Sequence, residues 1–470
     1  MRRVPEIAPD SSGGDDVDAP VLAAARGDIT HGPLTRALFR IAGPAILAKA
    51  LHAALGLVDV FWVSRLGAAQ SAAVTTSFFA SWILVSAVDL TALGILAHVA
   101  RHTGAHDRAR AGHAAAQGLV VGVWLGVLFA VGAWFAAPWL FRTLGTASDV
   151  TTNGVTYLRI LFLAAPFTFT YLNCEFLMRA AGDTRSPLVV AAIAVLFNAV
   201  LDPLLIYGVG PFPRLGVAGA GWATLLAQAV ACAVFAAYAF RRHPNFPLTV
   251  ASLRQLDMRL TANLLRIGFP GMAVGTFYST IYLFMSGIAA RLGTRELAIL
   301  GLANRSESVT YLVTNGFGAA TATVVGQCLG AGRPERAERA AWASVGWMTG
   351  YAFLTGTLLV VWPQAILRLF TADPSVVELG APYLRILGYA QPLMAVEIVL
   401  EHAFAGAGDT VPPMLVSVPM NALRVPLLWW IVRTGGGLLE MGWVLAITCM
   451  ARGVLAALWF RRGGWKHRNL

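Results

Sequence analysis

The sequence predicts an all-α polytopic membrane protein with twelve transmembrane helices, arranged as two six-helix lobes related by internal duplication. Three observations lead to this fold class. The chain of 470 residues is 57% hydrophobic and only 13% charged, its apolar residues gather in long runs, and short motifs recur at a constant spacing. Roughly 20 apolar residues cross about 30 Å of hydrocarbon, so this composition excludes an ordinary soluble protein.

Twelve apolar runs are expected to span the membrane, because each is long enough to cross it and holds few charges. They lie near residues 36–63, 71–100, 112–137, 155–178, 187–207, 216–240, 262–289, 297–326, 338–362, 381–404, 412–432 and 440–460. Glycine, proline and charged residues separate them, which favours turns between the runs.

Polar segments flank and divide these runs. Residues 1–32 are rich in Gly and Asp and lack the apolar stretch of a signal peptide, so we expect a disordered cytoplasmic tail. A basic, proline-containing segment at 241–262 reads as a cytoplasmic linker between lobes at 33–240 and 263–462. Residues 463–470 form a basic cytoplasmic tail.

Three short motifs recur at one spacing along the chain. RLG at 65 recurs at 291, YLRIL at 157 recurs at 383, and AGDT at 181 recurs at 407, so each pair is separated by 226 residues. A constant offset across most of six spans indicates duplication of a six-helix unit. Because six is even, both copies have the same orientation and form parallel repeats, as in some transporters.

The basic residues predict the orientation in the membrane. The net charge is +11, and most Lys and Arg lie in the tails, the linker and the loops on the same side, such as Arg241 and Arg242. By the positive-inside rule both termini are cytoplasmic and the protein is a multi-pass protein of the cell (inner) membrane. Arg291, Arg295 and Arg433 depart from the bias. This distribution fits membrane topology better than nucleic-acid binding.

The sequence holds no motif that predicts an enzyme, a cofactor or a metal centre. The four cysteines lie in or beside apolar runs and none forms CxxC, so no zinc site follows. We therefore expect neither an enzyme nor a resident cofactor.

Acidic residues inside the apolar runs are the strongest functional signal. Asp59, Asp89 and Asp202 each lie within an apolar run. Insertion of a charge at the membrane centre costs a free energy of roughly 2.5–3.5 kcal/mol, so such a charge marks a functional site by default. Asn198 and Asp202 are four residues apart and share a helix face, and Pro203 loosens the backbone beside them. This pattern predicts a proton or cation site.

The duplication separates function from fold at these positions. Asp59 corresponds to Met285 at an offset of 226, and NAVLDP at 198–203 corresponds to NALRVP at 421–426, which places Val425 opposite Asp202. A purely structural acid should recur in both copies, so restriction to the first repeat favours function. A polar contact between helices stays open as the alternative for each acid.

Other polar or aromatic side chains inside apolar runs are candidates for cavity or substrate contacts. They are His52, Asp89, Glu307, Glu397, Phe277 and Tyr278. Glu401 has a counterpart, Glu175, at the 226 offset, which favours repeat architecture for both.

Several stretches together resemble one transporter family. They are LVDVFWVSRLG, AGDTRSPLVV, FNAVLDPLLIYG, GVAGAGWAT, LANRSESVTYL, GQCLGAG and AGAGDTVPP. In this order they resemble the multidrug and toxic compound extrusion (MATE) transporters, in particular the DinF-like and archaeal-type prokaryotic branch, over about residues 28–460.

The resemblance implies two lobes in a V and an alternating-access antiporter. It implies export of amphipathic, cationic compounds against inward H⁺ or Na⁺, by a monomer in the lipid bilayer with no nucleic-acid partner. The residues that match the family's coupling site are Asp59, Tyr157, Asn198, Asp202 and Thr224, where Na⁺ is an alternative to the proton. Arg305 and Glu307 match an eighth-span motif, whereas a seventh-span acid of another branch is missing here.

Other functions remain open at this point. One is a flippase or exporter of a lipid-linked or metabolite substrate in the same wider superfamily, although such carriers usually have cationic cavities. A membrane-embedded enzyme or an assembly subunit is a different class, but neither explains acids confined to one repeat.

Overall fold

The computed structural model describes residues 29–143, 148–240, 246–468 and 470, and the regular structure within these ranges is helical. The first half contains α2 (Leu34–Val63), η1 (Ser64–Leu66), α3 (Ala68–Gly104), α4 (Arg108–Thr143), α5 (Ser148–Leu163), α6 (Ala165–Ala180), α7 (Arg185–Tyr207) and α8 (Val217–Phe240). The second half contains α9 (Val250–Arg254), α10 (Met258–Leu292), α11 (Thr294–Gly330), α12 (Pro334–Val361), α13 (Pro363–Arg368), α14 (Pro374–Ala407), α15 (Val411–Arg433), α16 (Leu438–Arg461) and η2 (Gly464–His467).

Each of the twelve predicted runs coincides with a helix or a helix pair. Among the described residues, ten helices are long and apolar enough to cross a membrane, and the bent pair α5–α6 makes an eleventh. The pair bends by 50° just before Pro166, which lacks the amide hydrogen needed to continue α5. The eighth run forms α11, which is long but too polar to meet that criterion. α10 begins inside the range expected for the linker.

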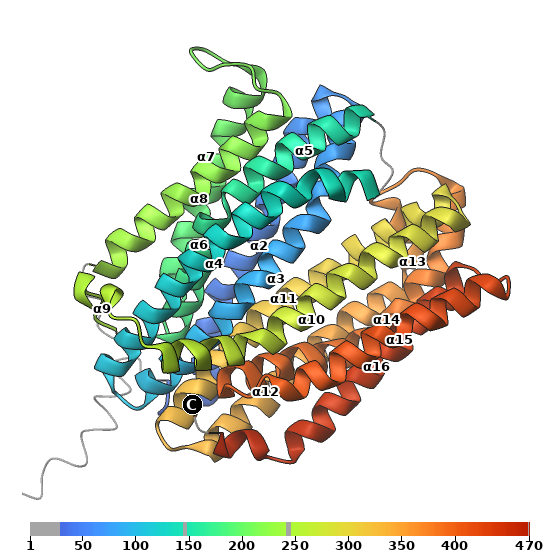
Figure 1. The fold of residues 1–470 in the computed structure, drawn as a ribbon. Coiled ribbons are helices and arrows are strands. Elements are labelled where there is room, and N and C mark those ends of the chain that lie inside the picture. Colours follow the sequence, from blue (N-terminus) through green and yellow to red (C-terminus); the bar gives the residue numbers. More distant parts are fainter. Residues whose placement is uncertain (1–28, 144–147, 241–245, 469) are drawn as a thin grey trace, which may run out of the picture.

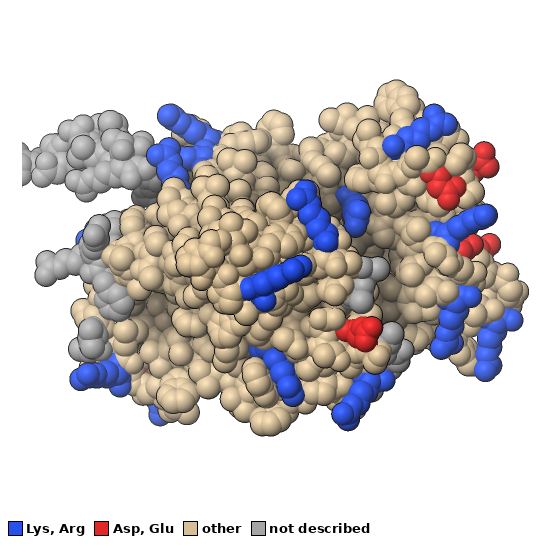
Figure 2. Space-filling view, turned by 90° about the horizontal axis from the view of Figure 1, so that it is seen from above, with Lys and Arg blue, Asp and Glu red and all other residues tan. Residues whose placement is uncertain are grey.

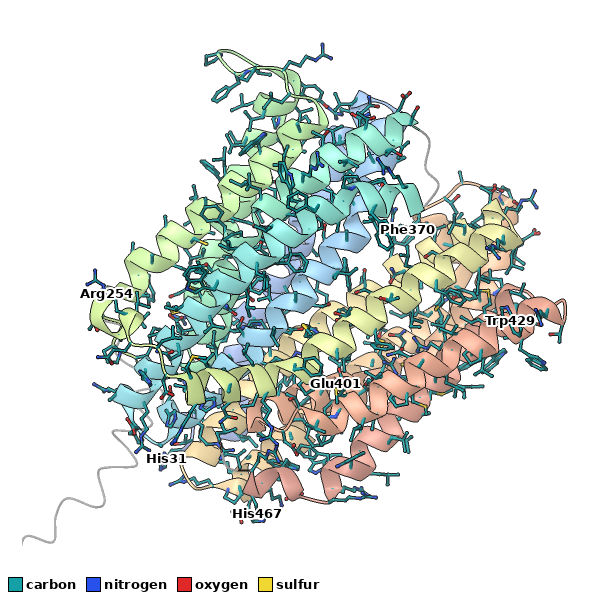
Figure 3. The ribbon with its side chains drawn as sticks, in the orientation of Figure 1. His31, Arg254, Phe370, Glu401, Trp429 and His467 are labelled. Atoms are coloured by element: carbon teal, nitrogen blue, oxygen red, sulfur yellow. The ribbon has the colours of Figure 1, made fainter. Side chains whose placement is uncertain are left out.

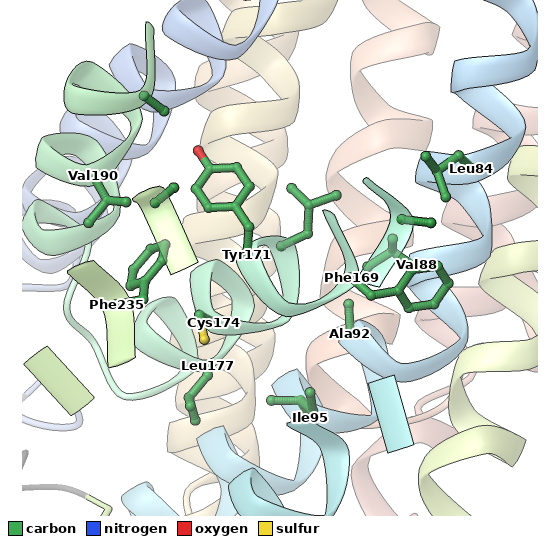
Figure 4. Packing of buried hydrophobic residues seen from close by; sticks show 14 of the residues in the cluster. Leu84, Val88, Ala92, Ile95, Phe169, Tyr171, Cys174, Leu177, Val190 and Phe235 are labelled. Carbon is green, nitrogen blue, oxygen red and sulfur yellow. The ribbon is translucent and has the colours of Figure 1, made fainter. Parts of the chain in front are cut away.

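Two lobes meet on the side that carries α9 and the C-terminus, hereafter the linker side, and diverge toward the opposite side (Figure 1). In the first lobe an apolar stripe on α3, with members three or four residues apart, faces α6 (Figure 4). Leu84, Val88, Ala92 and Ile95 form this stripe. Such spacing places side chains on one helix face, so the sequence pattern positions α3 at the centre of its lobe.

Corresponding helices pair in the same way in both lobes. α7 packs on α8 as α15 packs on α16, and α3 packs on α4 as α11 packs on α12. These repeated pairings fit the internal duplication that the 226-residue offset predicted.

The first helix of each repeat is shared between the lobes. The linker-side part of α2 buries Leu38 and Ile41 against the second lobe, where they join Phe317 and Val324 in one core, while α2 also packs on α7 of the first lobe. In the same way α10 packs on α3 of the first lobe and on α15 of the second. Both helices therefore connect one lobe mechanically to the other.

Glycines bring the two lobes into backbone contact on the linker side. A Cβ on Gly104 would lie 2.0 Å from the Gln327 carbonyl oxygen, and one on Gly268 would lie 2.0 Å from that of Leu90. A Cβ on Gly330 would lie 1.9 Å from the Arg101 carbonyl oxygen. Backbones approach this closely only where a side chain is missing.

The segment before α2 is tied to the second lobe. Residues 1–28 of the expected tail lie outside the described residues, but Ile29 is buried. Arg336 donates to the carbonyl oxygens of Ile29, His31 and Gly32 at 3.0–3.2 Å. Residues 29–32 are therefore fixed on α12.

The C-terminal segment also packs on the protein. Trp465 stacks on Phe460 with ring centroids 4.5 Å apart, and Arg101 of the first lobe donates to the Arg468 carbonyl oxygen at 2.8 Å and to that of Ala407 at 3.2 Å. The segment expected as a tail thus bridges both lobes on the linker side.

The recurring AGDT turn contains an acid whose role differs between the repeats. Because the acid recurs at the same turn of both repeats, the sequence predicts that Asp183 and Asp409 each cap the following helix. The Asp183 carboxylate accepts hydrogen bonds from the backbone N–H of Arg185 at 3.1 Å and of Ser186 at 3.0 Å, so the predicted cap of α7 is confirmed. Among the described residues Asp409 makes no such bond, and burial raises its pKa above the ordinary value. The expected cap at Asp409 is therefore wrong.

Asp183→Ala is expected to lower the free energy of unfolding by about 1 kcal/mol, because the first turn of α7 loses its carboxylate acceptor. The measurement is thermal unfolding in detergent, with Asp409→Ala as the matched control because that acid caps nothing. Equal losses in both variants would contradict a capping role.

Candidate functional site

Five side chains from four helices of the first lobe converge on one point, and we call them the first-lobe cluster. They are Asp59 on α2, Tyr157 on α5, Asn198 and Asp202 on α7, and Thr224 on α8. The Asp59 Oδ2 atom accepts hydrogen bonds from Tyr157 Oη at 3.2 Å and from Thr224 Oγ1 at 3.0 Å. Asn198 Nδ2 lies 3.4 Å from Asp202 Oδ1 and 3.5 Å from Thr224 Oγ1.

The first-lobe cluster is buried and incompletely bonded. Asn198 and Asp202 are fully buried, and Asp59 is 5% exposed. The Asp59 and Asp202 carboxyl groups lie within hydrogen-bonding reach of each other. Within the part of the chain that the structure describes, Asp59 Oδ1, Asn198 Oδ1 and Asp202 Oδ2 accept no hydrogen bond from an N–H or O–H group. Buried polar atoms normally find partners, so the three unpaired acceptor oxygens of this cluster can hold a proton or a small cation.

Local sequence features bring these helices together. A Cβ on Gly219 would lie 2.5 Å from the Leu205 carbonyl oxygen of α7, and one on Gly221 would lie 3.1 Å from Ile160 of α5. The missing side chains let α8 approach both helices and present Thr224 to Asp59. Pro203 lies within α7 directly after Asp202.

Two further candidates, His52 and Asp89, lie outside the first-lobe cluster. His52 Nδ1 is 3.9 Å from Glu175 Oε2, and its ring stacks on Tyr171 at 5.2 Å. Glu175 in turn pairs with Arg179 at 3.3 Å. Asp89 forms no ion pair within the part of the chain that the structure describes, and it faces Gly271 of the second lobe. Sequence reasoning missed the Glu175–Arg179 pair because it assigned Glu175 to repeat architecture.

The remaining candidates lie in the second lobe. Glu307 Oε1 accepts a hydrogen bond from Gln391 Nε2 at 2.8 Å, and Glu397 Oε1 is 2.9 Å from Arg452 Nη1. Tyr278 packs beside Tyr282 with ring centroids 5.6 Å apart.

Glu397 belongs to a wider polar group at mid-depth in this lobe. Ser417 Oγ donates to Glu401 at 2.9 Å and lies 3.4 Å from Glu397. In Figure 3, Glu401 lies between His467 on the linker side and Trp429 on the opposite side. Phe277 is 43% exposed and joins no polar group.

Sequence reasoning missed the basic side chains of the second lobe. Arg424 and Arg452 are buried within α15 and α16. The signal was present, because an arginine inside an apolar run is as costly as an acid. The sequence prediction rested on intramembrane acids alone and so left out the arginine in NALRVP.

A protein-held metal centre is not evident in the described ranges. They contain no group of three or more His, Cys, Asp or Glu side chains that could hold a metal ion. A cation at the first-lobe cluster would instead use two carboxylates and the Asn198 amide oxygen, which are hard oxygen ligands.

Comparison with known sequences gives the family. The MatE family model matches twice, over residues 44–204 and 270–430, so the second match begins 226 residues after the first. "Probable multidrug resistance protein NorM" of Thermotoga maritima is 24% identical over 440 residues, covering 93% of this chain and 94% of that protein. "FAD transporter" of Shewanella oneidensis is 26% identical over 404 residues, covering 86% and 88%.

Solved structures share the fold. A MOP superfamily transporter from Pyrococcus furiosus, described as having a binding pocket of reverse polarity, superposes with a TM-score of 0.86 at 23% identity. An outward-facing multidrug resistance MATE family transporter superposes with the same TM-score at 22% identity. Each comparison covers 94% of this chain and 99% of the other. With its buried acids, its two lobes and two MatE matches, the chain belongs to the MatE (multidrug and toxic compound extrusion) family and is a multi-pass membrane transporter, not an enzyme.

Proposed function

We propose that this transporter is an antiporter that exports amphipathic organic compounds by alternating access, driven by inward H⁺ or Na⁺. The observation that carries the proposal is the first-lobe cluster, in which two carboxyl groups lie together in a buried pocket. One of them belongs to α2, the helix shared between the lobes.

The chemistry of the pair supplies the coupling. A proton or a cation between Asp59 and Asp202 removes the repulsion of two neighbouring negative charges. At about 4 Å and an effective dielectric constant of about 20, that repulsion amounts to about 4 kcal/mol. Such an energy changes a conformational equilibrium by roughly a thousandfold, which is enough to bias one lobe arrangement over another.

α2 is the element that would transmit this change. Asp59 lies near its end on the side opposite the linker, and Leu38 and Ile41 near its start are packed into the second lobe. Binding or loss of the ion changes how α2 packs against α7. The start of α2 then moves and changes the contact between the lobes.

The described arrangement corresponds to an outward-open state if both termini are cytoplasmic in the inner membrane. The lobes meet on the linker side and diverge on the other. Figure 2 shows a face that is mostly uncharged and is hollowed between the two halves of the molecule. The charged side chains on this face are Lys and Arg more often than Asp and Glu.

We infer that the protein acts as a monomer whose apolar surface contacts lipid.

The second lobe offers contacts for a cationic part of the substrate. Glu307 is partly exposed, and the rings of Phe277 and Tyr278 stand on the neighbouring helix α10. A carboxylate and aromatic faces both attract organic cations. Export of a lipid-linked or metabolite substrate is the second candidate, which the buried Arg424 favours.

Reconstitution into proteoliposomes tests the proposal. Efflux of a fluorescent amphipathic cation is measured under an inward H⁺ gradient and, separately, under an inward Na⁺ gradient. One of the two gradients is expected to drive uphill export. Equal downhill leakage with and without either gradient would refute coupled antiport.

A further inference from the structure

The second lobe contains a buried guanidinium group, that of Arg424. Arg424 on α15 is 2% exposed; its Nε donates to Thr448 Oγ1 at 2.8 Å and its Nη2 lies 3.5 Å from the Leu445 carbonyl oxygen. Among the described residues no carboxylate lies within ion-pair distance of it. Arg452 nearby differs, because it pairs with Glu397 at 2.9 Å. A buried charge is costly unless an opposite charge accompanies it.

Asn421 gives a second and independent sign of a ligand. It lies three residues before Arg424, so both side chains share one face of α15. Asn421 is fully buried, and within the described ranges neither its Nδ2 nor its Oδ1 has a hydrogen-bond partner. The Oε1 atom of Gln391 on α14 has no partner in the same ranges either. Unpaired polar groups of this kind are rare in folded proteins.

The repeat shows that this place corresponds to the first-lobe cluster with its charge inverted. Tyr157 and Asn198 have counterparts in Tyr383 and Asn421, so the polar frame recurs. The two acids are replaced by Met285 and Val425, and Arg424 is added on the same helix. A place that lacks both of these acids and gains a guanidinium group suits an anion.

We propose that Arg424 and Asn421 bind an anionic group, a carboxylate or phosphate, of the transported compound. The guanidinium fork matches the two oxygens of such a group, and the Asn421 amide adds a donor. Glu307 lies within electrostatic range of Arg424 and is positioned for a cationic part. The preferred substrate is thus a zwitterionic amphipath. This inference rests on the proposed function, because it names the substrate class of that exporter.

A matched pair of dyes tests the site. A rhodamine with a free carboxylate and its methyl ester differ only in the anionic group, and both are titrated by fluorescence anisotropy against the full chain in detergent. The wild type is expected to bind the acid more tightly than the ester. Arg424→Gln should weaken binding of the acid by about tenfold or more and leave binding of the ester unchanged, which also shows that the variant is folded.

Two variants serve as controls. Arg433→Gln removes an exposed arginine of the same helix, which stacks on Trp429. This variant should change the binding affinity of neither dye. Arg424→Lys keeps the charge without the fork and should retain part of the preference for the acid. Chloride is titrated as a competitor, with gluconate as the reference anion, to identify an inorganic occupant.

The outcomes separate the alternatives. The proposal is overturned if the wild type does not bind the acid or if Arg424→Gln weakens both dyes equally. The proposal is also overturned if chloride, at low concentration, displaces the acid dye from the wild type, because chloride would then be the main occupant of the site. Loss of ion-driven ester export in wild-type proteoliposomes would instead count against coupled antiport, since the binding measurement does not depend on a gradient.

Discussion

Asp59→Asn and Asp202→Asn each abolish ion-driven efflux, while the protein still inserts, folds and binds substrate. Asparagine has nearly the shape of aspartate but can neither carry the negative charge nor exchange a proton. The remaining carboxyl then has no charged neighbour, and the repulsion of about 4 kcal/mol that drives the change is lost. The second lobe has Met285 and Val425 at the corresponding positions, so it supplies no substitute.

The measurement is uphill export in proteoliposomes together with proton release on substrate addition in detergent. Both signals should fall to the protein-free background in either variant. Asp183→Asn is the matched control, because that acid lies at a turn outside the first-lobe cluster, and it should export normally. If both variants export at the wild-type rate under an H⁺ and a Na⁺ gradient, the coupling site lies elsewhere. Glu307 and Asp89 would then be the next residues to test.

Gly268→Ala prevents the lobes from closing on the linker side and strongly reduces transport. The added Cβ would lie 2.0 Å from the Leu90 carbonyl oxygen of the opposite lobe, and backbone cannot yield as a flexible side chain can. Overpacking of this kind costs about 1–3 kcal/mol, which corresponds to a loss of the closed population by a factor of about 5 to about 150. Alanine favours a helix over glycine by about 1 kcal/mol, so α10 itself is not weakened.

Distances between spin labels report this effect directly. Labels on Arg110→Cys and Arg339→Cys, in a background without the native cysteines, stand on exposed linker-side positions of different lobes. Gly268→Ala should lengthen and broaden their separation. Gly287→Ala on the same helix is the control, since its Cβ would meet open space. An unchanged distribution in Gly268→Ala would show that the lobes tolerate the extra atom.

The helices and the first-lobe cluster could largely be predicted from the sequence, for physical reasons. A membrane span must satisfy its backbone internally, so an apolar run of sufficient length becomes a helix. An acid in such a run must find a partner, so Asp59 and Asp202 could be expected to meet. Comparison of the two repeats then identified the acids that occur in one lobe only.

Other features depend on contacts between distant segments. The sharing of α2 between the lobes depends on Leu38 and Ile41 meeting Phe317, and no local pattern encodes that pairing. The docking of Trp465 on Phe460 likewise results from tertiary packing. The sequence places Arg424 inside an apolar run, but only the structure shows that, among the described residues, no carboxylate lies within ion-pair distance of it.

The duplication also bears on ion stoichiometry and on how such a molecule can evolve. A dimer of identical six-helix units carries every change at two sites, so it has either two ion pockets or none. Fusion into one chain releases this constraint. Under the proposed function, one half keeps Asp59 and Asp202 for a single ion per cycle, and the other half is free to acquire Arg424 for a different ligand. The covalent join therefore allows a division of labour that a symmetric homodimer cannot reach.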